Sequence, residues 1–234
     1  MGLKSEKDQK RYLTVLADGK LHERVDEDTE GAKVRTKKEQ DGTVVDVEDK
    51  DGNLIYELTY PGLEDVMIKS IKFNDGDYGT NINVELEDDE DNQFILSLQC
   101  ASNYGERFME VLPNIDLNKA VEIDPYSFTP KGKTEKVRGL SIKQDGEKLE
   151  SAFSTRDEEG NFEVHIKGFP MPDAKKDYSK GERWKIFFAE RRDWVMEYLV
   201  EAGLVESADD AEPEEETKPK KKAAKGKKDE DEAF

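Results

Sequence analysis

Alternating apolar and polar residues, separated by short turn sequences, dominate the first 150 residues of the chain. Asp-Gly pairs stand at 18–19, 41–42, 51–52, 75–76 and 145–146, and this dipeptide favours tight hairpin turns. The segments beside them predict strands at 43–47, 54–60, 66–74, 81–87, 93–98, 121–128, 137–144 and 148–153, and a further strand at 162–166. We therefore expect a mainly β fold.

A helix is predicted between the strand that ends at residue 98 and the strand that begins at residue 121. Asn103 and Glu106 have the spacing of a capping pair, and Pro113 ends the segment. One helical face is apolar and comprises Tyr104, Phe108, Val111 and Leu112. Three strands, a helix and two strands is the order of the five-stranded oligonucleotide/oligosaccharide-binding (OB) barrel. Other β-rich domains also contain one helix, so this order alone does not select the fold.

A second helix is predicted near the end of the domain. Ser179 and Glu182 form its capping pair, and Gly203 ends it. Its broad apolar stripe comprises Trp184, Phe187, Phe188, Trp194, Val195, Tyr198 and Leu199. Because aromatic residues at helical spacing usually belong to a core, we expect the helix to dock on the barrel.

Composition divides the chain into three parts. Residues 1–31 are highly charged and are expected to be loosely held, whereas residues 32–205 form the predicted OB domain with extra N-terminal strands and the C-terminal helix. Residues 206–234 contain one sizeable apolar side chain, Phe234, which is too little to offset the entropy of folding, so this tail is expected to be disordered. The tail holds 11 acidic residues and seven lysines, so residues 1–205 still carry −15 of the total net charge of −19.

Other features argue against a membrane protein, an exported protein or an enzyme. The sequence contains no run of 18 apolar residues and no apolar signal segment near Met1, so we expect a cytoplasmic protein without a membrane partner. Cys100 is the only cysteine, and His22 and His165 are the only histidines, so neither a disulfide, a metal nor a cofactor is expected. The segment 132–134 lacks the first glycine of a phosphate-binding loop.

Positive charges and aromatic residues coincide on the surface that an OB barrel uses for binding. That surface is the face of strands two and three, together with the loops that join strands one to two and four to five. Cations follow the phosphates of a single strand, and rings stack on its bases. The candidate DNA-binding residues are therefore Phe73, Tyr78, Phe94, Tyr126, Phe128, Lys131, Lys133, Lys136, Arg138, Lys143, Lys33 and Arg35.

The orientation of two of these rings stays open at this point. Tyr126 and Phe128 share one face of their predicted strand, and Val121 and Ile123 share the other. One of these sets fills the core and the other faces solvent. Tyr78 lies in a glycine-flanked turn, where we expect its ring to be exposed.

The chain ends Asp-Glu-Asp-Glu-Ala-Phe at residues 229–234. This ending, with the strand order over residues 54–153, resembles the single-stranded DNA-binding proteins of tailed bacteriophages and bacteria, which pair an OB barrel with a flexible acidic tail ending in phenylalanine. Bacterial members usually have proline where Ala233 stands, so the phage proteins are the closer resemblance.

The resemblance implies a protein that coats single-stranded DNA during replication, recombination and repair, in the host cytoplasm if a phage encodes it. It also implies that the tip of the tail binds replication or recombination proteins through Asp229, Glu230, Asp231, Glu232 and Phe234. The oligomeric state stays open, with a monomer as one option. A rival hypothesis is an acidic protein-interaction or DNA-mimic module, whose negative surface imitates a nucleic-acid backbone.

Overall fold

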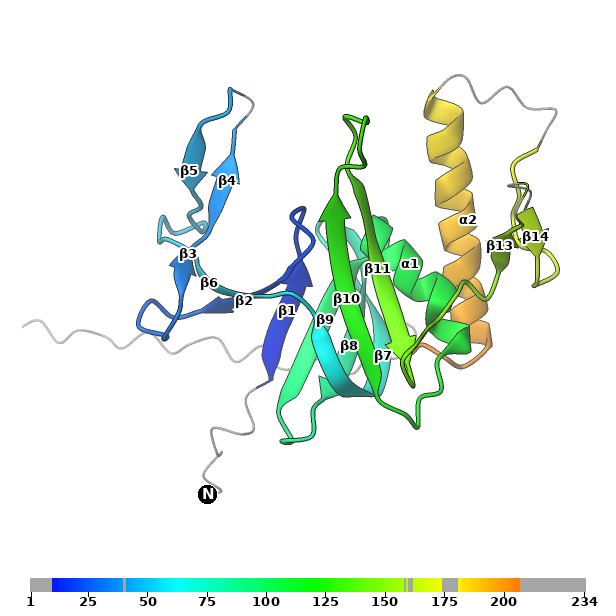
Figure 1. Ribbon diagram of the computed structural model, residues 1–234, viewed down its shortest axis with the longest axis horizontal. Coiled ribbons are helices and arrows are strands. Elements are labelled where there is room, and N and C mark those ends of the chain that lie inside the picture. Colours follow the sequence, from blue (N-terminus) through cyan, green and yellow to red (C-terminus); the bar gives the residue numbers. More distant parts are fainter. Residues whose placement is uncertain (1–9, 40, 158, 160–161, 174–180, 207–234) are drawn as a thin grey trace, which may run out of the picture.

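The computed structural model describes residues 10–39, 41–157, 159, 162–173 and 181–206. In this part of the chain, ten strands form one sheet in the order β12-β11-β10-β7-β8-β9-β1-β2-β6-β3 (Figure 1). Their bounds are β1 Arg11–Val15, β2 Leu21–Val25, β3 Lys33–Val34, β6 Tyr56–Tyr60, β7 Leu63–Gly76, β8 Gly79–Glu87, β9 Gln93–Gln99, β10 Val121–Phe128, β11 Val137–Gln144 and β12 Glu147–Lys148. Two short hairpins pair β4 (Thr36–Lys38) with β5 (Val44–Asp46), and β13 (Ser154–Arg156) with β14 (Phe162–Val164). The mainly β fold is confirmed.

The central strands follow the alternation in the sequence. In β8, Ile82, Val84 and Leu86 are buried, and the polar residues between them are only partly buried. Asp145 and Gly146 both have positive φ angles, 54° and 78°, as a tight turn between β11 and β12 requires. The predicted strand at 148–153 is an exception, because β12 ends at Lys148 and β13 begins only at Ser154.

The order of strands predicted for the barrel is present, but the barrel is not closed. Strands β7, β8 and β9 form an antiparallel meander, and β10 returns after helix α1 (Asn103–Val111) to pair with β7 and β11. An OB barrel closes when its fifth strand pairs with its third, which here would join β11 to β9. The outer edge of β9 is instead occupied by β1, in a parallel pairing that places Leu13 opposite Leu96. The predicted closed five-stranded sheet is therefore wrong, because an N-terminal strand takes the edge that closure needs.

The expectation that residues 1–31 are loosely held is also wrong for residues 10–31. Leu13 and Leu21 are 1% and 0% exposed and belong to the core. The guanidinium of Arg11 donates hydrogen bonds to Glu23, and the Tyr60 hydroxyl donates another. Burial alone would raise the pKa of Glu23, but these bonds lower it. Apolar burial and a partly buried ion pair thus outweigh the local excess of charge.

Helix α1 covers one end of the core, with Phe108 fully buried. Its N-cap is Ser102, whose hydroxyl accepts a hydrogen bond from the backbone N–H of Gly105. The predicted cap, Asn103, is the first helical residue instead. After Val111 the chain continues as the short 3₁₀ helix η2 (Leu112–Asn114), which contains Pro113, so the proline ends the α-helix as expected.

Helix α2 (Gly181–Glu201) docks through its C-terminal half. Val195 and Leu199 are buried in the core, and the rings of Trp194 and Tyr198 lie edge-on against Phe153. The N-terminal half extends past α1 (Figure 1), and there Trp184 and Phe188 of the predicted apolar stripe are 36% and 43% exposed, so the stripe is only partly buried. Ser179, the predicted cap, lies outside the described residues. Neither helix in the described ranges has the length and apolarity needed to cross a membrane.

Candidate nucleic-acid interface

The hairpin of β10 and β11 presents a small apolar surface to solvent. Tyr126 and Phe128 lie on its outer face with exposed fractions of 37% and 53%, and their ring centroids are 5.9 Å apart. Val137 is directly opposite Phe128 and is also exposed. Val121 and Ile123 point the other way, into the core. The structure therefore decides the open question in favour of outward-facing rings.

Gly139 makes room for the ring of Tyr126. These two residues are opposite each other on β10 and β11, and a Cβ at residue 139 would lie 2.4 Å from the hydroxyl oxygen of Tyr126. Any larger side chain would therefore push the ring off the hairpin. A glycine inside a predicted strand is typical of a close approach, so Gly139 is the sequence signal for this contact.

The loop that joins β10 and β11 places three lysines next to these rings. Lys131, Lys133 and Lys136 are exposed, and none of them makes an ion pair with a described residue. The loop extends from the end of the hairpin, away from the helices' contact with the sheet (Figure 1). The predicted combination of aromatic and cationic side chains thus lies on one hairpin.

Arg138 lies on the other face of the same hairpin. It is opposite Ser127, one residue out of phase with Tyr126 and Phe128, so its side chain points away from the two rings. The side chain of Asn103 donates a long hydrogen bond of 3.4 Å to the Arg138 carbonyl. Arg138 is exposed and lines a hollow beside the start of α1.

Tyr78 occupies the turn between β7 and β8 and is 90% exposed, as expected. Its carbonyl accepts a hydrogen bond of 2.8 Å from the Gln99 side chain, which ties the turn to the end of β9. The charged side chains of this turn are Asp75 and Asp77. The ring is therefore available for stacking, but it has acidic rather than basic neighbours in the chain.

Three other candidate residues are buried in the core or paired with carboxylates. Phe73 and Phe94 are 3% and 7% exposed and belong to the core, and the Arg11 guanidinium lies 4.9 Å from the Phe94 ring. Lys143 bridges two carboxylates, at 2.9 Å from both Glu122 and Asp124, and these hydrogen bonds raise the pKa of its ammonium group. The assignment of Phe73 and Phe94 to an exposed DNA surface is therefore wrong, and Lys143 would have to exchange a carboxylate for a phosphate in order to bind DNA.

Lys33 and Arg35 do not join the same surface. Lys33 belongs to β3, the last strand of the sheet at the end opposite to β11 and β12, and Figure 1 shows the two regions apart. Arg35 donates a hydrogen bond of 2.5 Å to Glu57. The predicted tail residues Asp229, Glu230, Asp231, Glu232 and Phe234 lie outside the described residues.

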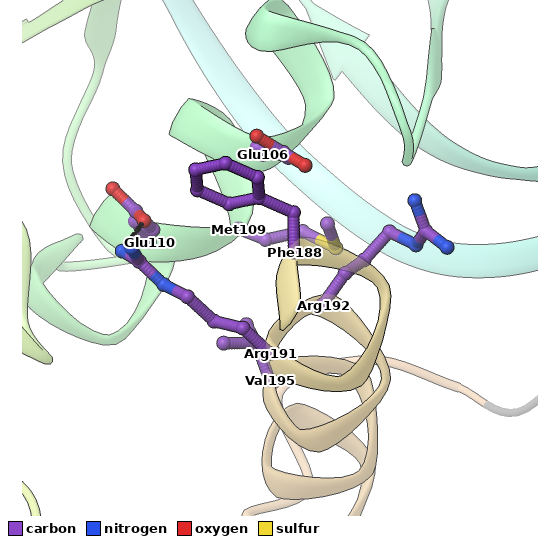
Figure 2. A pocket seen from close by; sticks show the side chains of 7 residues that line it. All are labelled: Glu106, Met109, Glu110, Phe188, Arg191, Arg192 and Val195. Carbon is purple, nitrogen blue, oxygen red and sulfur yellow. Dashed lines mark hydrogen bonds and ion pairs between the residues drawn. The ribbon is translucent and has the colours of Figure 1, made fainter. Parts of the chain in front are cut away.

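A second hollow lies between α1 and α2 and is shown in Figure 2. Arg191 of α2 makes an ion pair with Glu110 of α1, and Phe188 lies beside Glu106. Burial and the nearby Glu110 raise the pKa of Glu106. With a volume of about 40 Å³, this space fits a water molecule rather than a ligand. The residues around it hold the two helices together, and the space is not a candidate binding site.

The exposed rings and lysines of the β10–β11 hairpin are the features that bear on function. No protein-family model, no curated protein sequence and no solved structure matches this chain.

Proposed function

We propose that this chain is a non-enzymatic single-stranded DNA-binding protein that acts in DNA replication, recombination and repair. The observation that carries the proposal is the β10–β11 hairpin, where the exposed rings of Tyr126 and Phe128 adjoin a loop whose three lysines make no ion pair with a described residue. Rings offer stacking surfaces to any base, and ammonium groups attract the phosphates between the bases. This mixture binds a single strand without reading its sequence.

The geometry of the rings suits two separate bases. Their planes are inclined by 39° with centroids 5.9 Å apart, so each ring keeps a face that the other does not cover. Base-aromatic stacking contributes about 1–3 kcal/mol per base. The hairpin fixes both rings through a strand register that places Tyr126 over Gly139, which reduces the ordering cost on binding.

The excess of acidic residues makes the ionic part of binding weak and local. With a net charge of −15 over residues 1–205, the loop lysines supply the attraction at the hairpin while the rest of the chain repels DNA. Three phosphate contacts on a single strand correspond to a salt slope of about −2 in log K against log salt concentration. Binding is therefore strongest in dilute buffer and depends mainly on stacking at moderate salt.

The order of the strands supports the proposal even though the sheet does not close into a barrel. Strands β7, β8 and β9, helix α1, and strands β10 and β11 follow the OB order, and in that fold the loop between strands four and five borders the oligonucleotide site. Here that loop is the lysine loop. The proposal also includes the tail, where Phe234 and the acidic residues before it would bind replication or recombination proteins. This part is supported by the resemblance of residues 229–234 to the acidic tail tip of single-stranded DNA-binding proteins.

Titration of labelled oligo-dT by fluorescence anisotropy, at low and moderate salt, tests the DNA-binding role. Replacement of Phe128 by Leu keeps an apolar side chain but removes the ring, so we expect about 1–3 kcal/mol weaker binding. The matched control is Val137→Ala, because Val137 is opposite Phe128 on the same face but cannot stack. Equal effects of the two substitutions would show that the rings do not stack on bases.

The contribution of the loop has its own pair of variants. Lys131, Lys133 and Lys136 are replaced together by alanine, and the control replaces Lys33, Lys37 and Lys38, which removes the same charge near the other end of the sheet. We expect the loop variant to lose affinity and about 2 units of salt slope, and the control to change neither. Absence of oligo-dT binding by the intact chain in dilute buffer would refute the proposal and favour the DNA-mimic alternative.

A further inference from the structure

A cavity of about 290 Å³ lies on the side of the hairpin opposite to the two rings. It is open to solvent on one side and is lined by the β1–β2 turn, the end of β9, the start of α1 and Arg138 of β11. Val15 and Leu16, which are both partly exposed, form an apolar wall, and the side chains of Gln99, Asn103 and Arg138 provide polar groups. Among the described residues that line it, none carries a carboxylate.

The walls of this cavity are fixed by contacts that do not depend on a ligand. The Tyr104 hydroxyl donates a hydrogen bond of 3.2 Å to the Leu16 carbonyl, which joins α1 to the β1–β2 turn. In the same turn, a Cβ at Gly19 would lie 2.3 Å from the backbone nitrogen of Ser127, so this turn packs closely against β10. The cavity is therefore preformed, as small-molecule sites usually are.

The chemistry of the lining selects the kind of ligand. The side-chain amides of Gln99 and Asn103 each donate one hydrogen bond within the protein, to the carbonyls of Tyr78 and Arg138. Each amide keeps an oxygen acceptor and a second N–H donor, which the edge of a nucleobase requires. The guanidinium of Arg138 matches a phosphate, which it can bind through two N–H groups. The volume is at the lower end of the range of about 300–1,000 Å³ for small-molecule pockets, so it suits one nucleotide and not a longer ligand.

We propose that this cavity is a nucleotide subsite, which holds one nucleotide with its phosphate at Arg138, its base against Val15 and Leu16, and the base edge at Gln99 and Asn103. The inference rests on the proposed DNA-binding function and adds a second place of contact to it. Lys136 is two residues before Arg138, so single-stranded DNA that leaves the lysine loop can pass around the start of β11 and reach this side of the hairpin. The bound strand would then contact both faces of the hairpin.

Nuclear magnetic resonance of the full chain, titrated with thymidine monophosphate, tests the subsite directly. The side-chain amide signals of Gln99 and Asn103 and the backbone signal of Ser97 report on the cavity. We expect these three signals to shift on addition of the nucleotide, with at least tenfold weaker binding of thymidine, which lacks the phosphate. Shifts of equal size and affinity with inorganic phosphate alone would overturn the inference, because the cavity would then be a simple anion site.

Variants separate this inference from the proposed function. Asn103→Ala and Arg138→Ala should each weaken binding of the mononucleotide at least fivefold, whereas Asn118→Ala, in an exposed loop before β10, should not change it. Phe128→Leu should weaken oligo-dT binding and leave mononucleotide binding unchanged. If oligo-dT binds and responds to Phe128→Leu but not to the cavity variants, the subsite is refuted and the DNA-binding proposal stands. Should a cavity variant not fold, the titration of the unmodified chain still decides.

Discussion

Replacement of Gly19 by alanine is expected to destabilise the protein strongly, because the β1–β2 turn packs against the backbone of β10. A Cβ at this residue would lie 2.3 Å from the nitrogen of Ser127 and 2.5 Å from the carbonyl carbon of Tyr126. Both contacts are to backbone atoms, which no side-chain rotation relieves. The turn would have to move away from β10 by about 1 Å to restore ordinary van der Waals contact.

The size of the effect follows from comparison with Gly146. Both glycines have a φ of +78°, but a Cβ at Gly146 meets nothing within 4 Å, so Gly146→Ala measures only the backbone strain of about 1–2 kcal/mol. Gly19→Ala adds overpacking, at about 1–3 kcal/mol, and loss of the Tyr104 to Leu16 hydrogen bond, at about 1 kcal/mol. We expect Gly19→Ala to lose about 2–4 kcal/mol more than Gly146→Ala.

Urea unfolding followed by circular dichroism measures this difference. The midpoint should fall much further for Gly19→Ala than for Gly146→Ala, and an unchanged slope would show that the same surface is exposed on unfolding. Equal losses in the two variants would refute the reasoning. They would mean that the turn is not held against β10 and that the N-terminal strands are as loosely attached as their charge suggested.

Four further predictions concern binding, pH and reactivity. Tyr78→Ala should weaken oligo-dT binding by about 1–3 kcal/mol without lowering the melting temperature. The control Tyr12→Ala, which also removes an exposed ring, should change neither the affinity nor the melting temperature. Unaltered affinity of Tyr78→Ala would exclude stacking at residue 78. Deletion of residues 229–234 should abolish partner binding and leave DNA affinity equal or higher, and a clear loss of DNA affinity would contradict this. Burial and the nearby Glu110 raise the pKa of Glu106, so ionised Glu106 destabilises the folded state once the pH exceeds the pKa of the unfolded chain, about 4.3. Glu106→Gln should therefore raise the melting temperature at pH 7 but not at pH 3. A lower melting temperature of the variant at pH 7 would contradict this prediction. Burial raises the pKa of the Cys100 thiol to about 12, so it should react with Ellman's reagent at pH 8 only after unfolding, and prompt reaction of the native protein would disprove its burial.

Local sequence signals predicted the elements around the candidate site well. The bounds of β10 and β11 equal the predicted ranges 121–128 and 137–144, because alternation and the turn at Asp145-Gly146 agree with each other. Alternation also placed Tyr126 and Phe128 on one face. It did not say whether that face is inside or outside, since this depends on which face packs against the rest of the sheet.

Distant contacts explain the predictions that were wrong. Nothing in the local pattern of Arg11–Val15 shows that this strand pairs with β9, more than 80 residues away along the chain. Phe73 and Phe94 were predicted as surface rings by their nearness to a loop or a binding strand, but the core lies on their side of the sheet. Lys143 has two carboxylates on the neighbouring strand, and only the register of β10 with β11 brings them within 2.9 Å.

Short-range patterns along the chain were enough to predict the mainly β character, the position of both helices and the hairpin that carries two rings and a lysine loop. These features depend on interactions between residues close together in the chain, where turn chemistry and periodicity act. Only the folded chain shows which rings face solvent, which cations are paired with carboxylates, where the N-terminal strands attach and that a cavity lies beside Arg138. Each of these depends on packing and pairing between segments far apart in sequence, which short-range patterns do not specify.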